Sequence, residues 1–327
     1  MNKKCTIIGL GLCAIAICVI WLEVANNKKE KAPIRIATNP WPGFELLHLA
    51  DKKGFFKEEG VDVRLVRFST LEDARRAYER GQVDGITGGL IEIIKAHENG
   101  SSAKVLLITD FSNGSDFILA RKGINSLADL KGKKIALEAE SFGISMVAGA
   151  LEKGGLSFND VKLEGMNQLN ISAALLSGKI DAAHTYSPYS TEVMKHKDKI
   201  VKLMDSSDIP NEIIDILAID SDVVSNRTDD MKAIRRAWDK TVAYSREHPK
   251  EANLIMAEIE NISQQDFTDA MAGAKILNIL EQKQLFIRDG ILEQVLVKVN
   301  NLLHRDNPVK EIIQPDDYIA HIEDNKK

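Results

Sequence analysis

The first residue that could bind a small molecule is a tryptophan held between two prolines. Trp41 stands between Pro40 and Pro42, directly after a short β-branched run at residues 34–37. Because proline fixes its own φ and restricts the residue before it, the indole loses little freedom when it meets a ligand. Its face can stack on a flat group or receive an ammonium. The stretch predicts one wall of a binding site, and burial of Trp41 in a core is the alternative.

Four further loops carry residues suited to contact a ligand, namely residues 87–90, 110–116, 140–145 and 184–190. Their glycines let backbone N–H groups approach a ligand, and Ser141 near a predicted helix start favours an anionic or carbonyl oxygen. Tight turns, hinges and helix caps are the structural alternatives. The predicted ligand-binding residues are Trp41, Pro42, Gly43, Phe44, Glu45, Thr87, Gly88, Gly89, Asp110, Asp116, Ser141, Phe142, Gly143, Thr185, Tyr186 and Tyr189.

Sets of catalytic residues are missing from the sequence. The seven histidines form no H-x-x-x-H or H-E-x-x-H pattern, and there is no G-x-S-x-G elbow or P-loop. The three cysteines, Cys5, Cys13 and Cys18, all precede residue 23, which leaves the predicted folded part without a thiol. We therefore expect no enzymatic activity, no metal and no cofactor. His184 is the histidine predicted to lie in a cleft loop, where a structural hydrogen bond is the favoured role.

The composition is that of a globular protein. The chain has 327 residues, of which 44% are hydrophobic and 28% charged, and a formal net charge of −5. This length is sufficient for two domains. Because the net charge is negative and the lysines and arginines are scattered, nucleic-acid binding through a basic surface is excluded.

The N-terminal segment has the layout of an export signal or a membrane anchor. Residues 5–22 carry no charge and follow Lys3 and Lys4. This length lies within the roughly 17 to 25 residues of a membrane-spanning helix and exceeds the roughly 7 to 15 of a signal h-region. We predict an anchor or signal peptide over residues 1–25 and a linker over 26–33. The folded part is then periplasmic or at the cell surface, held to inner-membrane lipid through residues 5–22 if the segment is not cleaved.

An alternation of short apolar runs and helical patterns must position these loops. From residue 34 onward the alternation predicts βαβ units around largely parallel sheets, and it restarts once before the chain becomes almost wholly helical. We therefore expect an α/β protein of two lobes, with the ligand loops beyond the carboxyl ends of the strands. Lobe 1 is predicted over 34–112 and 220–322, the latter a helical C-terminal segment returning to it, and lobe 2 over 113–219. The crossings are predicted near 111–119 and 214–222.

Several stretches resemble a known family. They include "IRIATNPWPGFELLHLADKKGFFKEEGVDVRLVRF", "GQVDGITGG" and "SGKIDAAHTYSPY". In order along residues 33 to 320, they resemble the solute-binding proteins of nitrate-, sulfonate- and taurine-type ABC transporters. The resemblance implies a type II periplasmic-binding-protein fold, a monomer whose two lobes close by a hinge over one small organic solute and present it to an ABC permease. It also implies a cleft lined by residues 41–45, 87–89, 110, 141–143 and 185–189.

The N-terminus departs from this family, because it shows neither a clear cleavage site nor a lipoprotein signal. A membrane-anchored ligand-sensing subunit for a sensor kinase or cyclase is therefore the alternative function. Similar folds also resemble a pyrimidine-precursor synthase, but its cysteine-rich motif is absent from residues 23–327.

The nature of the ligand is suggested by charge. No arginine lies within the five loops, which weakens a nitrate or simple sulfonate ligand. Glu45, Asp110 and Asp116 instead favour a cationic group, so we hypothesise a zwitterion or an aromatic amine.

Overall fold

The computed structural model describes residues 31–138, 141–305 and 315–322. The chain divides into two units, Met1–Pro33 and Ile34–Lys327. The predicted anchor at residues 1–25 lies outside the described residues, as does most of the predicted linker. Within the described ranges, no helix has both the length and the apolar character needed to cross a membrane.

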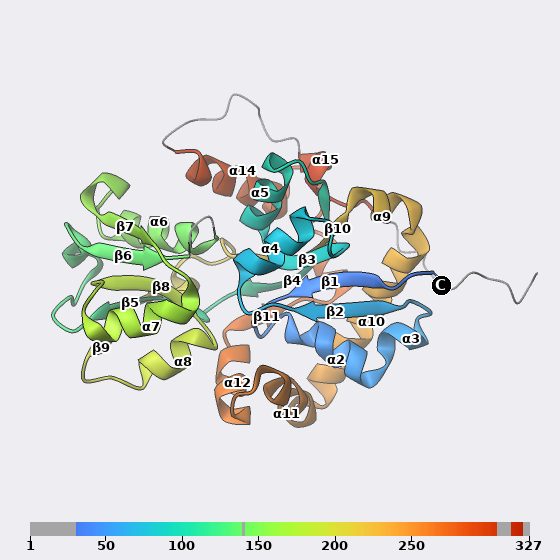
Figure 1. Ribbon diagram of the computed structural model, residues 1–327, viewed down its shortest axis with the longest axis horizontal. Helices are drawn as coiled ribbons and strands as arrows, with labels where there is room; N and C mark the ends of the chain where they lie inside the picture. Colours follow the sequence, from blue (N-terminus) through green and yellow to red (C-terminus); the bar gives the residue numbers. More distant parts are fainter. Residues whose placement is uncertain (1–30, 139–140, 306–314, 323–327) are drawn as a thin grey trace, which may run out of the picture. The chain divides into compact units, whose positions relative to one another are not determined.

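This unit contains two β-sheets with helices packed against them (Figure 1). The six-stranded sheet has the order β11-β4-β10-β3-β1-β2, with β1 (Ile34–Thr38), β2 (Val63–Arg67), β3 (Gly85–Gly89), β4 (Ala103–Ser112), β10 (Ile214–Asp220) and β11 (Ala274–Ile276). The five-stranded sheet has the order β7-β6-β8-β5-β9, with β5 (Asp116–Arg121), β6 (Lys134–Leu137), β7 (Lys162–Gly165), β8 (Ala182–Tyr186) and β9 (Ile200–Asp205). The two sheets confirm the predicted α/β class.

The sheets are mixed, although the sequence predicted them to be largely parallel. Strand β1 runs parallel to β2 and β3, and β6 runs parallel to β7 and β8. Strand β10, however, is antiparallel to β3 and β4, and β5 is antiparallel to β8 and β9. Each of these inserted strands begins where the chain has just left the other sheet, so it enters its own sheet from the opposite end.

The helices follow the strands as the periodicity predicts, and their ends carry recognisable signals. Thr70 accepts a hydrogen bond from the Asp73 N–H at the start of α4, and Pro249 occupies the first turn of α11. Gly54 ends α2 at φ 77°, a conformation that favours glycine. The helices are α2 (Glu45–Lys53), α3 (Phe55–Glu58), α4 (Leu71–Glu79), α5 (Leu90–Glu98), α6 (Gly143–Lys153), α7 (Gln168–Ser177), α8 (Tyr189–Met194), α9 (Ser221–Asn226), α10 (Thr228–Glu247), α11 (Pro249–Glu260), α12 (Gln264–Met271), α13 (Ile279–Gln282), α14 (Ile291–Leu303) and α15 (Pro315–Tyr318), with 3-10 turns at Leu127–Leu130, Phe158–Asp160 and Ser206–Asp208.

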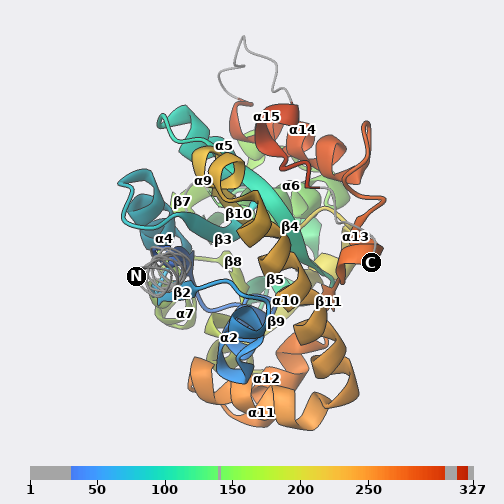
Figure 2. The same cartoon turned by 90° about the vertical axis from the view of Figure 1, so that its right-hand side faces the viewer.

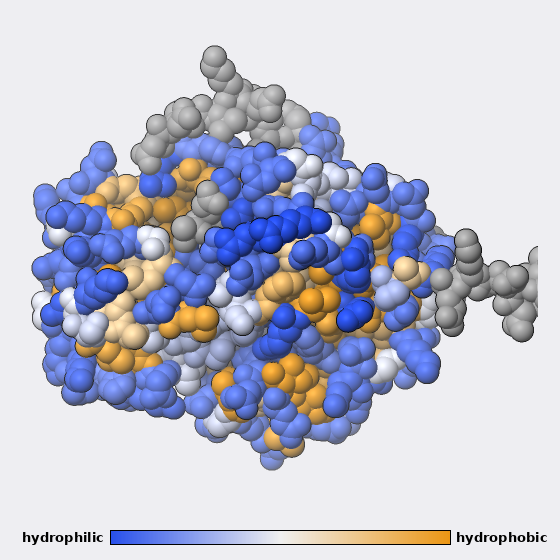
Figure 3. Space-filling view, viewed as in Figure 1, coloured by the Kyte–Doolittle hydropathy of each residue, from blue (hydrophilic) through white to orange (hydrophobic). Residues whose placement is uncertain are grey.

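Apolar side chains are buried on both faces of the six-stranded sheet. Helices α2, α10 and α11 pack together beside it (Figure 2), and Trp238 of α10 is fully buried there with its Nε1–H donating to the Leu277 carbonyl at 2.8 Å. The C-terminal segment returns to the same sheet, because the Ala320 N–H donates to the Val105 carbonyl at 3.0 Å. On the face seen in Figure 3, hydrophilic residues predominate and apolar residues form separate groups. Burial therefore accounts for most of the apolar pattern in the sequence.

Two adjacent segments join the sheets. The first links β4 to β5 through residues 113–115, and the second links β9 to β10 through residues 206–213. They are bonded to each other, since the Ser112 N–H donates to the Ile213 carbonyl at 3.1 Å and the Gly114 N–H donates to Ser206 Oγ at 2.7 Å. The second segment lies earlier than predicted.

Because this segment ends at residue 213, β10 (residues 214–220) belongs to the six-stranded sheet. Residues 214–219 were predicted to lie in the second lobe. An apolar run of this kind fits a buried strand in either sheet, so only the pairing with β3 and β4 decides its place. The lobe boundaries otherwise stay a prediction.

Candidate functional site

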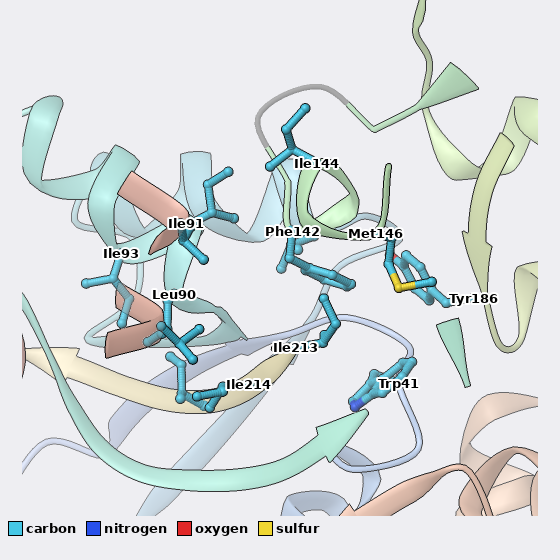
Figure 4. Close-up of a cluster of buried hydrophobic side chains, with 14 of the residues drawn as sticks. Trp41, Leu90, Ile91, Ile93, Phe142, Ile144, Met146, Tyr186, Ile213 and Ile214 are labelled. Atoms are coloured by element: carbon cyan, nitrogen blue, oxygen red, sulfur yellow. The ribbon is translucent and has the colours of Figure 1, made fainter. Parts of the chain in front are cut away.

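Aromatic side chains from both sheets meet at the predicted ligand loops. The ring of Tyr186, at the end of β8, lies 5.8 Å from that of Trp41 in an edge-to-face arrangement and 5.8 Å from that of Phe142. Phe44 lies 6.5 Å from Trp41, and Tyr189 lies 5.4 Å from Tyr186. Figure 4 shows Trp41, Phe142 and Tyr186 converging beside Ile213. We call these five rings, Trp41, Phe44, Phe142, Tyr186 and Tyr189, the aromatic cluster.

Trp41 is fixed from both ends of its loop. Its side chain is only 1% exposed, and its Nε1–H points at the two carboxylate oxygens of Asp110, at 3.1 and 3.2 Å. Its carbonyl accepts from the Phe44 and Glu45 N–H groups that begin α2. Gly43 allows this close approach, because a Cβ there would lie 1.9 Å from Asp110 Oδ2. The two alternatives for Trp41 therefore do not exclude each other, since the indole is buried and lies among the predicted site residues.

A buried pair of carboxylates lies beside the indole. Asp110 of β4 and Asp215 of β10 are register partners in the six-stranded sheet, and both are at most 1% exposed. Asp110 accepts from Trp41 and from the Thr109 hydroxyl at 3.0 Å, whereas neither oxygen of Asp215 has a hydrogen-bond partner among the described residues. Burial raises the pKa of Asp110 to about 7, and burial together with the charge of Asp110 raises the pKa of Asp215 well above its usual range.

The second sheet contributes a buried aspartate–histidine pair. His184 Nε2 lies 2.8 Å from Asp116 Oδ1, and neither side chain is exposed. Gly143 leaves room for the imidazole, because a Cβ there would lie 2.4 Å from His184 Nδ1. In the described part of the chain, His184 Nδ1 and Asp116 Oδ2 have no hydrogen-bond partner. One ring nitrogen of His184 and one carboxylate oxygen of Asp116 are therefore available to a ligand.

Two buried glutamates lie near the aromatic cluster. Glu92 of α5 accepts from the Gly89 N–H at 2.7 Å, and burial raises its pKa to about 8. Glu138, just after β6, has no partner for either carboxylate oxygen within the described ranges, and burial raises its pKa to about 7. The Tyr186 hydroxyl likewise lacks a partner, and burial and the nearby carboxylates raise its pKa.

A further acidic group lies at the start of α2. Glu45 is fully buried and accepts from Arg67 Nη1 at 2.6 Å, but its other oxygen and both oxygens of Glu260 have no partner in the described chain. Burial raises the pKa of Glu45 to about 7 despite the Arg67 charge, and burial and the Glu45 charge raise that of Glu260 to about 8. Burial and Arg67 also lower the pKa of His48 to about 4. Arg67 is therefore already engaged by a carboxylate.

The remaining predicted residues fall in three groups. Thr87, Gly88 and Gly89 form the buried end of β3, and Pro42 is buried in the Trp41 loop. Ser141 bonds within its own turn, donating to the Glu138 carbonyl at 2.9 Å and accepting from the Gly143 N–H at 3.3 Å, but it does not cap α6, whose N-cap residue is Phe142. Thr185 is buried with its hydroxyl unpartnered in the described residues, and the Tyr189 hydroxyl donates to the Ser69 carbonyl at 2.6 Å, which ties α8 to the loop before α4.

Several charged residues of this site were missed by sequence reasoning. They are Arg67, Glu92, Glu138, His184, Asp215 and Glu260, of which only His184 was considered, and then as a structural residue. Two of them, Glu92 in "LIEII" and Asp215 in "IIDILAI", share a signal that could have been used, namely a single acidic residue inside an apolar run. Burying a charged residue costs free energy unless the residue is paired or binds a ligand.

The site therefore holds a clear excess of buried carboxylates. Among the described residues, Glu45 is hydrogen-bonded to Arg67 and Asp116 to His184. When these groups are ionised, such an arrangement attracts cations and repels small anions. The buried carboxylates are Glu45, Glu92, Asp110, Asp116, Glu138 and Asp215, and the half-buried Glu260 is close enough to Glu45 for the two charges to interact. Among the described residues there is no group of three or more potential ligands arranged to hold a metal ion.

The fold is that of the periplasmic solute-binding proteins. The crystal structure of the periplasmic aliphatic sulphonate binding protein from Escherichia coli matches with a TM-score of 0.72, covering 89% of this chain and 98% of that chain at 16% sequence identity. This confirms the predicted two-lobed periplasmic-binding-protein fold. The family model described as NMT1/THI5 like matches residues 41–252, more than half of the chain, so the protein belongs to the NMT1/THI5-like family.

Two curated proteins similar to this chain are named as binding proteins. A protein of Brucella abortus (strain 2308), named only as a binding protein, is 24% identical over 294 residues, which are 88% of this chain and 90% of that protein. A protein of Bacillus subtilis (strain 168), named for binding aliphatic sulfonates, is 26% identical over 261 residues, or 78% and 77% of the two chains. The resemblance to sulfonate-type solute-binding proteins is confirmed.

Proposed function

We propose that this protein is an extracytoplasmic solute-binding protein that captures a small organic solute with a cationic group and delivers it to an ABC importer. The observation that carries this proposal is the set of buried carboxylate oxygens without partners around the aromatic cluster. Buried unpaired polar groups cost free energy, and a bound ligand that donates hydrogen bonds to them removes this cost. The family and the fold of its relatives support the solute-binding role.

The residue types favour an ammonium or amidine-like group over a sulfonate. Asp110 and Asp215 together offer acceptors beside the Trp41 indole, whose face can add a cation–π attraction of roughly 0.5 to 2 kcal/mol. A sulfonate would need fork donors, but Arg67 is engaged by Glu45. Although relatives are named for sulfonates, we therefore propose that this solute is a cation or zwitterion whose amine is held by the two aspartates.

Closure of two lobes is the proposed mechanism of capture. We propose that each sheet with its helices forms one lobe, with the candidate site between them. Contacts that span the sheets include the Trp41–Tyr186 ring contact and the Tyr189–Ser69 hydrogen bond. A solute that touches residues from both sheets stabilises the closed arrangement by the difference between its affinities for the closed and open states.

We further propose that the protein is not an enzyme. Some relatives are named as synthases of a pyrimidine phosphate, so an enzymatic role is the alternative to weigh. The Asp116–His184 pair has the orientation of a general base with its carboxylate, but the unpartnered Nδ1 of His184 has no nucleophile within hydrogen-bonding distance in the described chain. Chemical conversion of a bound solute by the purified protein would refute this part of the proposal.

A thermal-shift and calorimetric screen tests the ligand class. The full chain is mixed with amino sulfonates, polyamines and aminopyrimidines on one side and with nitrate and alkanesulfonates on the other. A cationic or zwitterionic solute present at 100 times its Kd should raise the free energy of unfolding by about 2.7 kcal/mol. Asp215→Asn should abolish this gain, whereas Glu152→Gln, an exposed control on α6, should preserve it. Stabilisation by the anions alone would contradict the proposed class.

The alternative of a sensing subunit rests on the apolar segment at residues 5–22, which could keep the protein in the membrane. Periplasmic or cell-surface location, anchoring and the identity of the receiving membrane protein are all part of the proposal. Loss of solute uptake on deletion of the gene supports transport, and loss of a solute-dependent kinase or cyclase response with uptake intact supports sensing.

A further inference from the structure

A pocket lies beside strand β11, outside the candidate solute site. It has a volume of about 590 Å³ and is formed by residues of β4, β11, the end of α10, α13 and the start of α14. We call it the β11 pocket. We propose that it binds a small amphiphilic organic anion, such as an aryl or short alkyl carboxylate or sulfonate.

The apolar part of the β11 pocket is formed before any ligand binds. Phe111 and Leu277 line it and are 4% and 5% exposed. Leu277 is held rigidly, because its carbonyl accepts from Trp238 Nε1 at 2.8 Å and from Gln282 Nε2 at 3.1 Å. Gln282 is itself fixed by the Ile108 N–H, which donates to its Oε1 at 2.8 Å. A ligand with an apolar body therefore meets a prepared surface and does not have to create one.

The charge at the rim of this pocket is positive. Arg246 pairs with Glu281 at 2.8 and 3.1 Å, so these two charges offset each other. Lys275 is the register partner of Phe111, and its ammonium lies 6.0 Å from the centre of that ring, within the outer range of a cation–π contact. No ion pair to Lys275 is found within the described ranges. The excess cation beside an aromatic wall suits a ligand that carries one anionic head next to its apolar body.

The size and position of the pocket define its occupant further. A volume of 590 Å³ lies within the roughly 300 to 1,000 Å³ typical of small-molecule sites. Phe111 directly follows Asp110, and neighbouring residues of a strand point to opposite faces, so the β11 pocket and the Asp110–Asp215 pair lie on opposite sides of β4. Asn211, on the segment that joins the two sheets, also lines the pocket. An occupant therefore contacts the joining segment at residues 206–213 through Asn211 without entering the solute site.

Fluorine NMR of the full chain tests the proposal. The probe is 4-fluorobenzenesulfonate, and its matched cationic control is 4-fluorobenzylammonium. We expect the sulfonate to bind, with an affinity at least about tenfold above that of the ammonium. Lys275→Glu should weaken the sulfonate about tenfold or more, and Leu285→Asp should abolish binding by placing a charge on the apolar wall. Lys250→Glu, an exposed control on α11, should leave the affinity unchanged.

Two outcomes would overturn the proposal. One is the absence of sulfonate binding by the wild-type chain, and the other is binding that Lys275→Glu leaves intact, which would place the probe elsewhere. Lys275 is exposed on a strand edge, so its substitution should not impair folding, and the proposal remains testable if Leu285→Asp fails to fold. Failure of this test would leave the proposed solute site untouched, because neither Lys275 nor Leu285 contributes to it.

Discussion

The burial of Glu92 predicts an unusual dependence of stability on pH. Its pKa is raised from 4.5 to about 8 in the folded protein, mainly because burial disfavours the charged form. The folded state therefore binds a proton between these pH values that the unfolded chain has already released. By linkage, the free energy of unfolding contributed by this group is fully present below pH 4.5 and is lost as pH rises towards 8.

The size of the effect follows from the two pKa values. One unit corresponds to about 1.4 kcal/mol, so a single group shifted from 4.5 to about 8 lowers the free energy of unfolding by roughly 3 to 4 kcal/mol between pH 5 and pH 8. Carboxylates with lowered pKa values, such as Asp73 and Asp84, act in the opposite direction but at lower pH. The window from pH 5 to 8 should therefore be dominated by the buried acids of the site.

Urea unfolding of the ligand-free protein at pH 5, 6, 7 and 8 measures this slope. Glu92→Gln keeps an acceptor for the Gly89 N–H and removes the ionisable group. Between pH 5 and 8, the free energy of unfolding of this variant should therefore fall by about 3 kcal/mol less than that of the wild type. Glu152→Gln, an exposed control, should keep the wild-type slope. The reasoning would be refuted if Glu92→Gln and wild type showed the same slope, or if wild-type stability rose across this range.

Three other predictions concern the site. The affinity for a cationic solute should rise between pH 6 and 8, because the carboxylates at Asp110 and Asp215 must be ionised to hold it; a calorimetric affinity independent of pH would contradict this. Trp41→Ala should remove solute-induced stabilisation and lower the unliganded free energy of unfolding by about 3 to 5 kcal/mol, because the indole is buried; a loss below about 1.5 kcal/mol in chemical denaturation would contradict this. Gly143→Ala should destabilise the protein by about 1 to 3 kcal/mol in thermal unfolding, because its Cβ would lie 2.4 Å from His184 Nδ1, and an unchanged midpoint would argue against this packing.

Much of the fold could be predicted from local patterns. Alternating apolar runs and amphipathic stretches predicted strands and helices, and the loops at Trp41, Thr87, Asp110, Phe142 and Tyr186 were chosen because they follow strands. Trp41, Phe142 and Tyr186 do lie together, as their ring contacts demonstrate, but Thr87, Asp110 and Tyr186 belong to the strands β3, β4 and β8 and not to loops that follow them. The period of side-chain burial and the chemistry of turns are properties of neighbouring residues, so they can be recognised without a structure.

Other features depended on pairing between distant segments. The sequence contains Asp215 only as one acid in an apolar run, and its register with Asp110, more than 100 residues earlier, arises when β10 inserts between β3 and β4. Burial of Trp41 likewise requires Tyr186 from the other sheet.

The types of elements and their order along the chain could therefore be recognised from local periodicity. Which acids share one buried environment depended on the tertiary fold. The free energy of a buried charge depends on every group that folding brings within a few ångströms of it, and sequence neighbours are a minority of those groups.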